Sequence, residues 1–139
     1  MAHPRRYDDQ DPWLRRLRQI ALAFPEAAEK ESHGRPVFFT QKVFVMYGAS
    51  VKGDHQSRVW DQSVVIKPDE EERRALLEDE RFFAPAYVGA SGWVGLDLRA
   101  ATPDWEEVRE LVDASYRNTA PKRLVAELDA RGSTVPDVR

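Results

Sequence analysis

The sequence contains no cysteine. Without thiols the protein can form neither a disulfide framework nor a thiolate metal site, and this absence fits a reducing compartment such as the cytoplasm. Histidine is also scarce, with 3 residues in 139, and these residues form neither an H-x-x-x-H pair nor an H-E-x-x-H pair. We therefore expect no metal ion and no other cofactor.

Long apolar runs are missing as well. No stretch reaches the roughly 18 apolar residues that a membrane-spanning helix needs. The N-terminal sequence MAHPRRYDDQD also lacks the apolar region of a secretion signal. The predicted location is therefore the cytoplasm, and no membrane partner is expected.

The chain has no excess of positive charge. Its 21 lysines and arginines are outnumbered by 24 aspartates and glutamates, so the formal net charge is −3. A nucleic-acid-binding domain usually carries a net positive charge. Any binding to nucleic acid must therefore come from a local basic patch.

The known catalytic motifs are absent too. Ser91 lies in the sequence G-A-S-G-W, which has tryptophan where the nucleophile motif G-x-S-x-G needs its second glycine. Neither a P-loop nor a dinucleotide-binding fingerprint is present. The protein is therefore predicted not to be an enzyme.

What the chain does have is the composition of a globular protein, with 42% hydrophobic and 32% charged residues. Its length predicts a single domain. We place this domain at residues 11–132, between a flexible N-terminus (residues 1–10) and a flexible tail (residues 133–139), and we expect a monomer.

Amphipathic segments predict the helices. In the first three an N-cap residue precedes a pattern of apolar residues spaced three or four apart. The predicted helices cover residues 11–24, 69–79, 102–117 and 121–131, with Asp11, Asp69 and Thr102 as N-caps of the first three and Gly132 as the end of the last.

Short β-rich runs predict an antiparallel sheet, because their connections are short. Residues 26–36 and 48–56 are predicted to be loops. The predicted strands cover residues 37–39, 43–47, 58–60, 63–67 and 93–98. The fold class is therefore α+β, with an antiparallel β-sheet packed against N-terminal and C-terminal helices.

The stretch from residue 82 to 98, FFAPAYVGASGWVGLDL, joins a loop to a strand. Gly92 is predicted to form a tight turn with positive φ, and in the strand after it Trp93 and Gly95 face away from the core. Trp60, Tyr87 and Trp93 are candidates for an exposed aromatic platform. The alternative is that they cover an edge of the core.

Six short motifs, spread over nearly the whole chain, carry a family resemblance. They are L-x-x-I-A-L-A-F-P (residues 17–25), H-G-R-P-V-F (33–38), K-V-F (42–44), V-I-K-P (65–68), P-A-Y-V-G-x-x-G-W-V-x-L-D-L (85–98) and S-Y-x-x-x-A-P-K-R-L (115–124). In this order they resemble the MmcQ/YjbR family of small bacterial proteins. The resemblance implies a CyaY-like (frataxin-like) α+β fold and DNA binding through a double-wing arrangement.

On this basis the leading hypothesis is a non-enzymatic DNA-binding protein. Stacking or wedging is assigned to Tyr87 and Trp93. The predicted phosphate contacts are Lys42, Lys67, Arg117, Lys122 and Arg123. The alternative is a module that binds a small anionic ligand or a peptide in a pocket lined by the same residues; a convex basic stripe would favour DNA, and a closed pocket would favour a compact anion.

The frataxin-like fold also raises the hypothesis of iron binding. It ranks third, because the predicted first helix exposes Arg15, Arg16 and Arg18 where frataxins present an acidic ridge.

Overall fold

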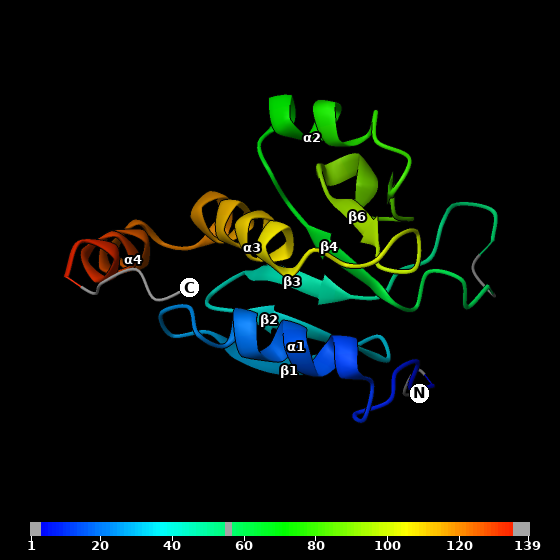
Figure 1. Ribbon diagram of the computed structural model, residues 1–139, viewed down its shortest axis with the longest axis horizontal. Coiled ribbons are helices and arrows are strands. Elements are labelled where there is room, and N and C mark those ends of the chain that lie inside the picture. The colour runs from blue at the N-terminus through cyan, green and yellow to red at the C-terminus, as the bar shows by residue number, and fades with distance from the viewer. Residues whose placement is uncertain (1–3, 55–56, 135–139) are drawn as a thin grey trace.

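The protein folds around one antiparallel sheet, as a computed structural model shows for residues 4–54 and 57–134 (Figure 1). The elements in chain order are α1 (Pro12–Ala21), β1 (Ala28–Ser32), β2 (Arg35–Phe39), β3 (Val43–Tyr47), β4 (Ser63–Ile66), α2 (Glu70–Leu76), β5 (Phe82–Phe83), the 3₁₀ turn η1 (Gly89–Ser91), β6 (Val94–Asp97), α3 (Trp105–Thr119) and α4 (Lys122–Thr134).

The six strands lie in the order β1-β2-β3-β4-β6-β5, and each neighbouring pair is antiparallel. Helices α1 and α3 lie side by side across one face of this sheet (Figure 1). The predicted α+β class with an antiparallel sheet packed against helices is therefore confirmed. In the described part of the chain, no helix has both the length and the apolar character that crossing a membrane requires.

The N-caps predicted for the first two helices are confirmed. A carboxylate oxygen of Asp11 accepts the backbone N–H of Trp13 at 2.9 Å, and the other accepts the hydroxyl of Tyr47 on β3. Asp69 caps α2 in the same way, through the N–H of Glu72. Since Asp11 bonds both to its own helix and to the sheet, it fixes where α1 begins on the sheet.

The loop predicted over residues 26–36 is wrong, because β1 forms there. The turn between β1 and β2 consists of His33 and Gly34, whose φ angles of 52° and 81° are those of a two-residue type I′ hairpin turn. β1 lies at the edge of the sheet and carries charged residues that protect an exposed edge. Its sequence, AEKES, therefore lacks the apolar alternation that reveals an inner strand.

Other boundaries also differ from the predictions. Residues 58–60 form no strand, and α3 begins at Trp105 behind Asp104, so Thr102 is not its cap. Asp104 has this role because its carboxylate accepts the N–H groups of Glu106 and Glu107. Two residues that were expected in a loop, Phe82 and Phe83, pair with β6 as β5.

The ends of the domain differ as well. α4 continues through Gly132 to Thr134, so the predicted stop at Gly132 is wrong. At the other end, the backbone of Arg6 bonds to Gly34 and the hydroxyl of Tyr7 bonds to Glu31, so this segment runs along the first hairpin. The outermost parts of the two predicted flexible ends, residues 1–3 and 135–139, lie outside the described residues.

The core lies between the sheet and the two helices. At its centre the rings of Phe24, Phe44 and Tyr116 pack with centroids 4.9 to 5.9 Å apart. The hydroxyl of Tyr116 donates to the carbonyl of Pro25 at 2.7 Å. All three rings are buried, and they join the segment after α1 to α3 and β3.

Gly92 has φ +99° directly before Trp93, which confirms the positive-φ turn predicted from the sequence. A Cβ atom at this position would meet only Cε of Lys67, at 3.6 Å, so a side chain has room but the backbone disfavours it. Replacing Gly92 with valine is therefore expected to lower the free energy of unfolding by about 1–3 kcal/mol.

Urea unfolding followed by tryptophan fluorescence measures this loss and reports on the surroundings of Trp93. Ala90→Val is the matched control, because Ala90 is exposed in the same turn and has an ordinary φ. Equal unfolding midpoints for the two variants would contradict the expected strain at Gly92.

Candidate functional site

The sheet face that α1 and α3 leave uncovered is apolar at its centre. One row of directly opposed residues crosses β2, β3, β4 and β6 and consists of Val37, Met46, Val65 and Gly95. An open face of an antiparallel sheet is ordinarily polar. Other parts of this chain already cover much of the row: Val37 and Val65 are 3% and 0% exposed, and Phe83 packs against Gly95. Met46 is the partly exposed member of the row.

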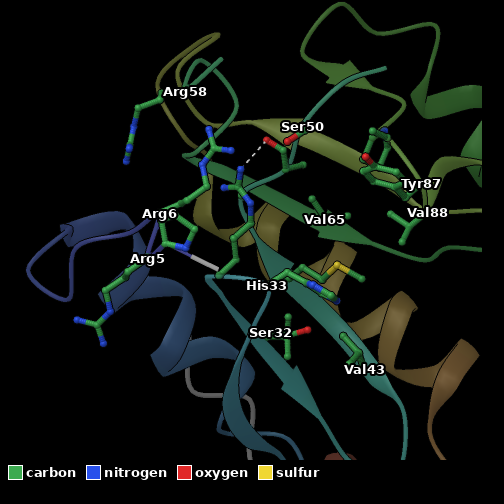
Figure 2. Close-up of a pocket in the computed structure, with 18 residues that line it drawn as sticks. Arg5, Arg6, Ser32, His33, Val43, Ser50, Arg58, Val65, Tyr87 and Val88 are labelled. Carbon is green, nitrogen blue, oxygen red and sulfur yellow. Dashed lines mark hydrogen bonds between the residues drawn. The ribbon is translucent and has the colours of Figure 1, made fainter. Parts of the chain in front are cut away.

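A pocket of about 970 Å³ is lined by three residues of this row, Val37, Met46 and Val65. Its floor consists of Val37, Val43, Met46 and Val65. Figure 2 shows the labelled arginines on one side of the pocket and Tyr87 with Val88 on the other. The pocket is thus apolar at its base and basic along one side.

Two loops build the wall opposite the arginines. The backbone N–H of Ala86 donates to the carbonyl of Ser50 at 2.7 Å, which ties residues 85–88 to the loop after β3. Val88 packs with Ala49 and Trp93 against the sheet. Tyr87, between Ala86 and Val88 in the chain, is 85% exposed. Its φ angle is +67°, a value that is rare for a residue with a side chain. An exposed aromatic ring held in a strained backbone is a common feature of binding sites.

The basic side is a cluster of arginines around a single carboxylate, which we call the Asp61 cluster. Nη1 of Arg35 lies 2.9 Å from Oδ1 of Asp61, Nε of Arg58 lies 2.9 Å from Oδ2, and Nε of Arg6 lies 3.6 Å from Oδ1. All three arginines line the pocket and Asp61 does not. The carboxylate therefore holds the guanidinium groups from behind and leaves them facing the cavity.

Arg35 is the most buried member of this cluster, with only 9% of its surface exposed. Loss of solvent lowers the pKa of its guanidinium, Asp61 opposes this change, and the positive charges of Arg6 and Arg58 add to it. Its Nη2 donates to the carbonyl of Ala49 at 3.1 Å. Arg35 thus remains a cation in a site with two other cations and one anion.

Gly48 makes room for this arrangement. It has φ +88°, and a Cβ atom there would collide with the guanidinium of Arg35 and lie 2.8 Å from the carbonyl oxygen of Asp61. No side chain fits beside the arginine at this point. Position 48 therefore requires glycine, because any side chain there would displace the guanidinium of Arg35.

Of the residues predicted from the sequence as nucleic-acid contacts, Tyr87 lines the pocket. Trp93 lies on the predicted face but is only 8% exposed, beneath Val88 and beside Val65, so its ring has no free surface for stacking. Trp60 packs on Phe83 with ring centroids 4.3 Å apart. For both tryptophans the alternative role, covering a core edge, describes their packing.

The predicted basic residues do not line this pocket. Two of them form ion pairs: Arg117 with Asp113 and Asp129, and Arg123 with Glu26 at 2.8 Å. The three lysines lie at the ends of elements: Lys42 before β3, Lys67 after β4 and Lys122 at the start of α4. Within residues 4–54 and 57–134, no group of three histidine or acidic side chains is placed to hold a metal ion; His3 and His55 lie outside these residues.

The Asp61 cluster was not predicted from the sequence. Arg35 is the member that the sequence best indicates as unusual, because it is a charged residue at the start of the apolar run R-P-V-F-F. Arg58 and Asp61 lie in a polar loop where charged residues are common, and nothing in the sequence distinguishes them. Only the packing of this loop beside β2 and β3 brings the three charges together.

Comparisons with known proteins agree with this fold. A family model described as YjbR matches residues 22–118, a range that includes Arg35, Arg58, Asp61 and Tyr87. Among solved structures, the chain is similar to the Deinococcus radiodurans protein DR2400, described as having a DUF419 domain, with 19% identity and a TM-score of 0.57 over 81% of this chain and 85% of that one. At this identity the likeness concerns the fold alone. No curated protein matches the chain.

Proposed function

This chain belongs to the YjbR family, and from that premise we propose that it is a non-enzymatic binding protein that holds a small amphiphilic anion on the open face of its sheet. The observation that carries the proposal is the pocket of about 970 Å³ with an apolar floor and the Asp61 cluster on one side. The CyaY-like assignment of the fold and a cytoplasmic location are part of the same proposal.

The size and lining of the pocket suit a small molecule. Ligand pockets in proteins have volumes of roughly 300–1,000 Å³, with a mostly apolar lining and a few polar groups that fix orientation. Here valine and methionine side chains supply the apolar surface, and guanidinium groups supply the polar one. A ligand with an apolar body and an anionic end would satisfy both.

The charges favour an anion over a neutral ligand. In the Asp61 cluster a single carboxylate balances three arginines, so positive charge remains beside the apolar residues that line the pocket. Guanidinium groups in such surroundings bind carboxylate and phosphate groups through paired hydrogen bonds. Anion binding would offset the repulsion among the arginines themselves.

DNA binding, which the family resemblance implied, suits this geometry less well. Carboxylates already pair with Arg117 and Arg123, two of the predicted phosphate contacts. The basic residues of the Asp61 cluster line a concave pocket, and a duplex backbone needs an open or convex basic surface. The DNA hypothesis is therefore tested beside the proposal and is not part of it.

The proposal predicts binding of the fluorescent amphiphilic anion 8-anilinonaphthalene-1-sulfonate to the folded protein. Replacing Arg58 with alanine is expected to weaken this binding by about five- to tenfold, because a charge-assisted contact is lost. Arg15→Ala removes the same charge from an exposed position on α1, away from the pocket, and should leave the affinity unchanged. Fluorescence titration at constant ionic strength gives both affinities.

If Arg15→Ala and Arg58→Ala weakened binding of the dye equally, the loss would come from the net charge of the protein. That result would contradict the assigned site. Anisotropy titrations of duplex and single-stranded DNA at several salt concentrations test the other hypothesis. A DNA interface would show log affinity falling with log salt by about 0.7 to 0.9 per neutralised phosphate. Salt-dependent DNA binding without any binding of the small anion would replace our proposal with the DNA one.

A further inference from the structure

The charge balance of the Asp61 cluster narrows the chemistry of the ligand. Building on the proposed function, we infer that the anionic end is a dianion, a terminal phosphate ester, attached to a flat apolar body. The inference rests on the charges that face the pocket, on the hydrogen-bond donors that remain in the cluster, and on the position of Tyr87 across the pocket from the arginines (Figure 2).

The charges around the pocket come from several elements. Arg6, Arg35 and Arg58 share Asp61 as their carboxylate. Arg5 has carboxylates of its own at 3.5 and 3.6 Å, in Asp9 and Glu31. The Asp61 cluster therefore keeps an excess of two positive charges. A monoanion such as a sulfate ester or a carboxylate would neutralise half of this excess, and a phosphate monoester dianion would neutralise all of it.

The cluster also keeps donors for the three terminal oxygens of a phosphate ester. Nε of Arg58 faces Asp61 at 2.9 Å as an ion pair, and the two terminal nitrogens of this guanidinium have no hydrogen-bond partner among the described residues. Arg58 comes from an exposed loop position, with 67% of its side chain in solvent, so its terminal nitrogens can move to a ligand. Paired N–H donors of this kind match phosphate oxygens in geometry as well as in charge.

The opposite wall determines what the phosphate is attached to. Tyr87 offers an exposed aromatic ring, Val88 and Pro85 lie beside it, and Val65 with Met46 forms the floor between this wall and the arginines. Figure 2 shows Tyr87 across the pocket from Arg6 and Arg58. A flat apolar group that lies along the floor would contact both walls, with its phosphate at the Asp61 cluster and its ring against Tyr87.

The test compares 1-naphthyl phosphate with 1-naphthyl sulfate, which share one aromatic body and differ in charge. Because the second phosphate pKa is about 6, we expect the phosphate to bind about tenfold more tightly than the sulfate at about pH 7.5 and about equally at about pH 5. His33 also lines the pocket, and because both anions meet the same His33, the phosphate-to-sulfate ratio at each pH is the quantity compared. Fluorescence titration measures the four affinities.

Two variants test whether the Asp61 cluster causes the preference for phosphate over sulfate. Arg58→Ala is expected to reduce the phosphate-to-sulfate ratio at least about threefold near pH 7.5, and Arg15→Ala is expected to leave it unchanged. Equal affinity for the two ligands at both pH values would overturn the dianion inference and leave the proposed function intact. Failure of both ligands to bind would overturn the proposed function itself.

The phosphate could belong to a small molecule or to the end of a nucleic acid. Competition with a single-stranded oligonucleotide, with and without a 5′-phosphate, separates these sources. Displacement of 1-naphthyl phosphate by the phosphorylated form alone supports a nucleic-acid end, and displacement by neither form supports a free phosphate ester. Equal displacement by both forms would contradict recognition of a terminal phosphate.

Discussion

Replacing Asp61 with alanine is expected to lower the free energy of unfolding by about 3–5 kcal/mol, the usual result of removing one partner from a buried ion pair. Arg35 is buried, and Asp61 is the carboxylate that compensates its charge at 2.9 Å. In the variant the guanidinium groups of Arg6, Arg35 and Arg58 would face one another with no anion between them. Equilibrium unfolding in urea measures the loss.

The matched control is Glu70→Ala, which breaks the ion pair between Glu70 and Arg73 on the surface of α2. The side chain of Glu70 is 61% exposed, so this change should cost at most about 1 kcal/mol. A ligand that supplies the missing negative charge should stabilise Asp61→Ala more than it stabilises Glu70→Ala, in which the cluster still has its own carboxylate. Equal losses in the two variants would show that Asp61 is only a surface charge.

Much of the sheet could be predicted from the sequence, because the inner strands show their environment in their residues. Val64 and Ile66 face the helices, and Val65 between them faces the pocket, so β4 is apolar on both sides. β1 could not be found in this way, since an edge strand half exposed to solvent has no such pattern. The pair His33 and Gly34, which forms the hairpin turn, is the one local indication of this strand, and in the sequence it lies within the predicted loop.

The candidate site was predicted less well, for a physical reason. Tyr87 could be identified from its place in a proline- and glycine-rich turn, which is a local property. The pairing of Arg35 with Asp61 spans 26 positions and depends on how the loop that holds Asp61 packs beside β2. Likewise, the sequence shows Asp113 four residues before Arg117, but the pairing of Arg123 with Glu26 becomes visible only in the fold. The cationic residues chosen with the family resemblance therefore included two arginines that are already neutralised.

Trp93 illustrates the same limit for an apolar residue. The alternation along β6 placed it correctly on the face opposite Val94 and Leu96. Whether that face was open at this point depended on Val88 and Ala49, which arrive from two other segments and cover the ring. A strand pattern gives the side of the sheet on which a residue lies, and it does not show what covers that side.

Replacing Ser115 with alanine is expected to destabilise the fold by about 2–4 kcal/mol, because a buried backbone carbonyl and a partly buried backbone N–H would lose their partner at once. The Oγ of Ser115 accepts the N–H of Lys67 at 2.8 Å and donates to the carbonyl of Phe44 at 2.6 Å. The side chain is fully buried on α3, so no water can replace it. This one hydroxyl therefore joins α3 to β3 and to the end of β4, and it holds the helix on the face of the sheet opposite the pocket.

Urea unfolding measures the stability of Ser115→Ala, and hydrogen exchange of the Lys67 amide reports the broken bond directly. Thr119→Ala is the control on the same helix, since the hydroxyl of Thr119 only donates to the carbonyl of Ser115 one turn earlier and should contribute less than about 0.5 kcal/mol. Faster exchange at Lys67 is expected in Ser115→Ala alone. If exchange at Lys67 stayed protected while stability fell, the loss would come from the cavity and not from the two backbone bonds.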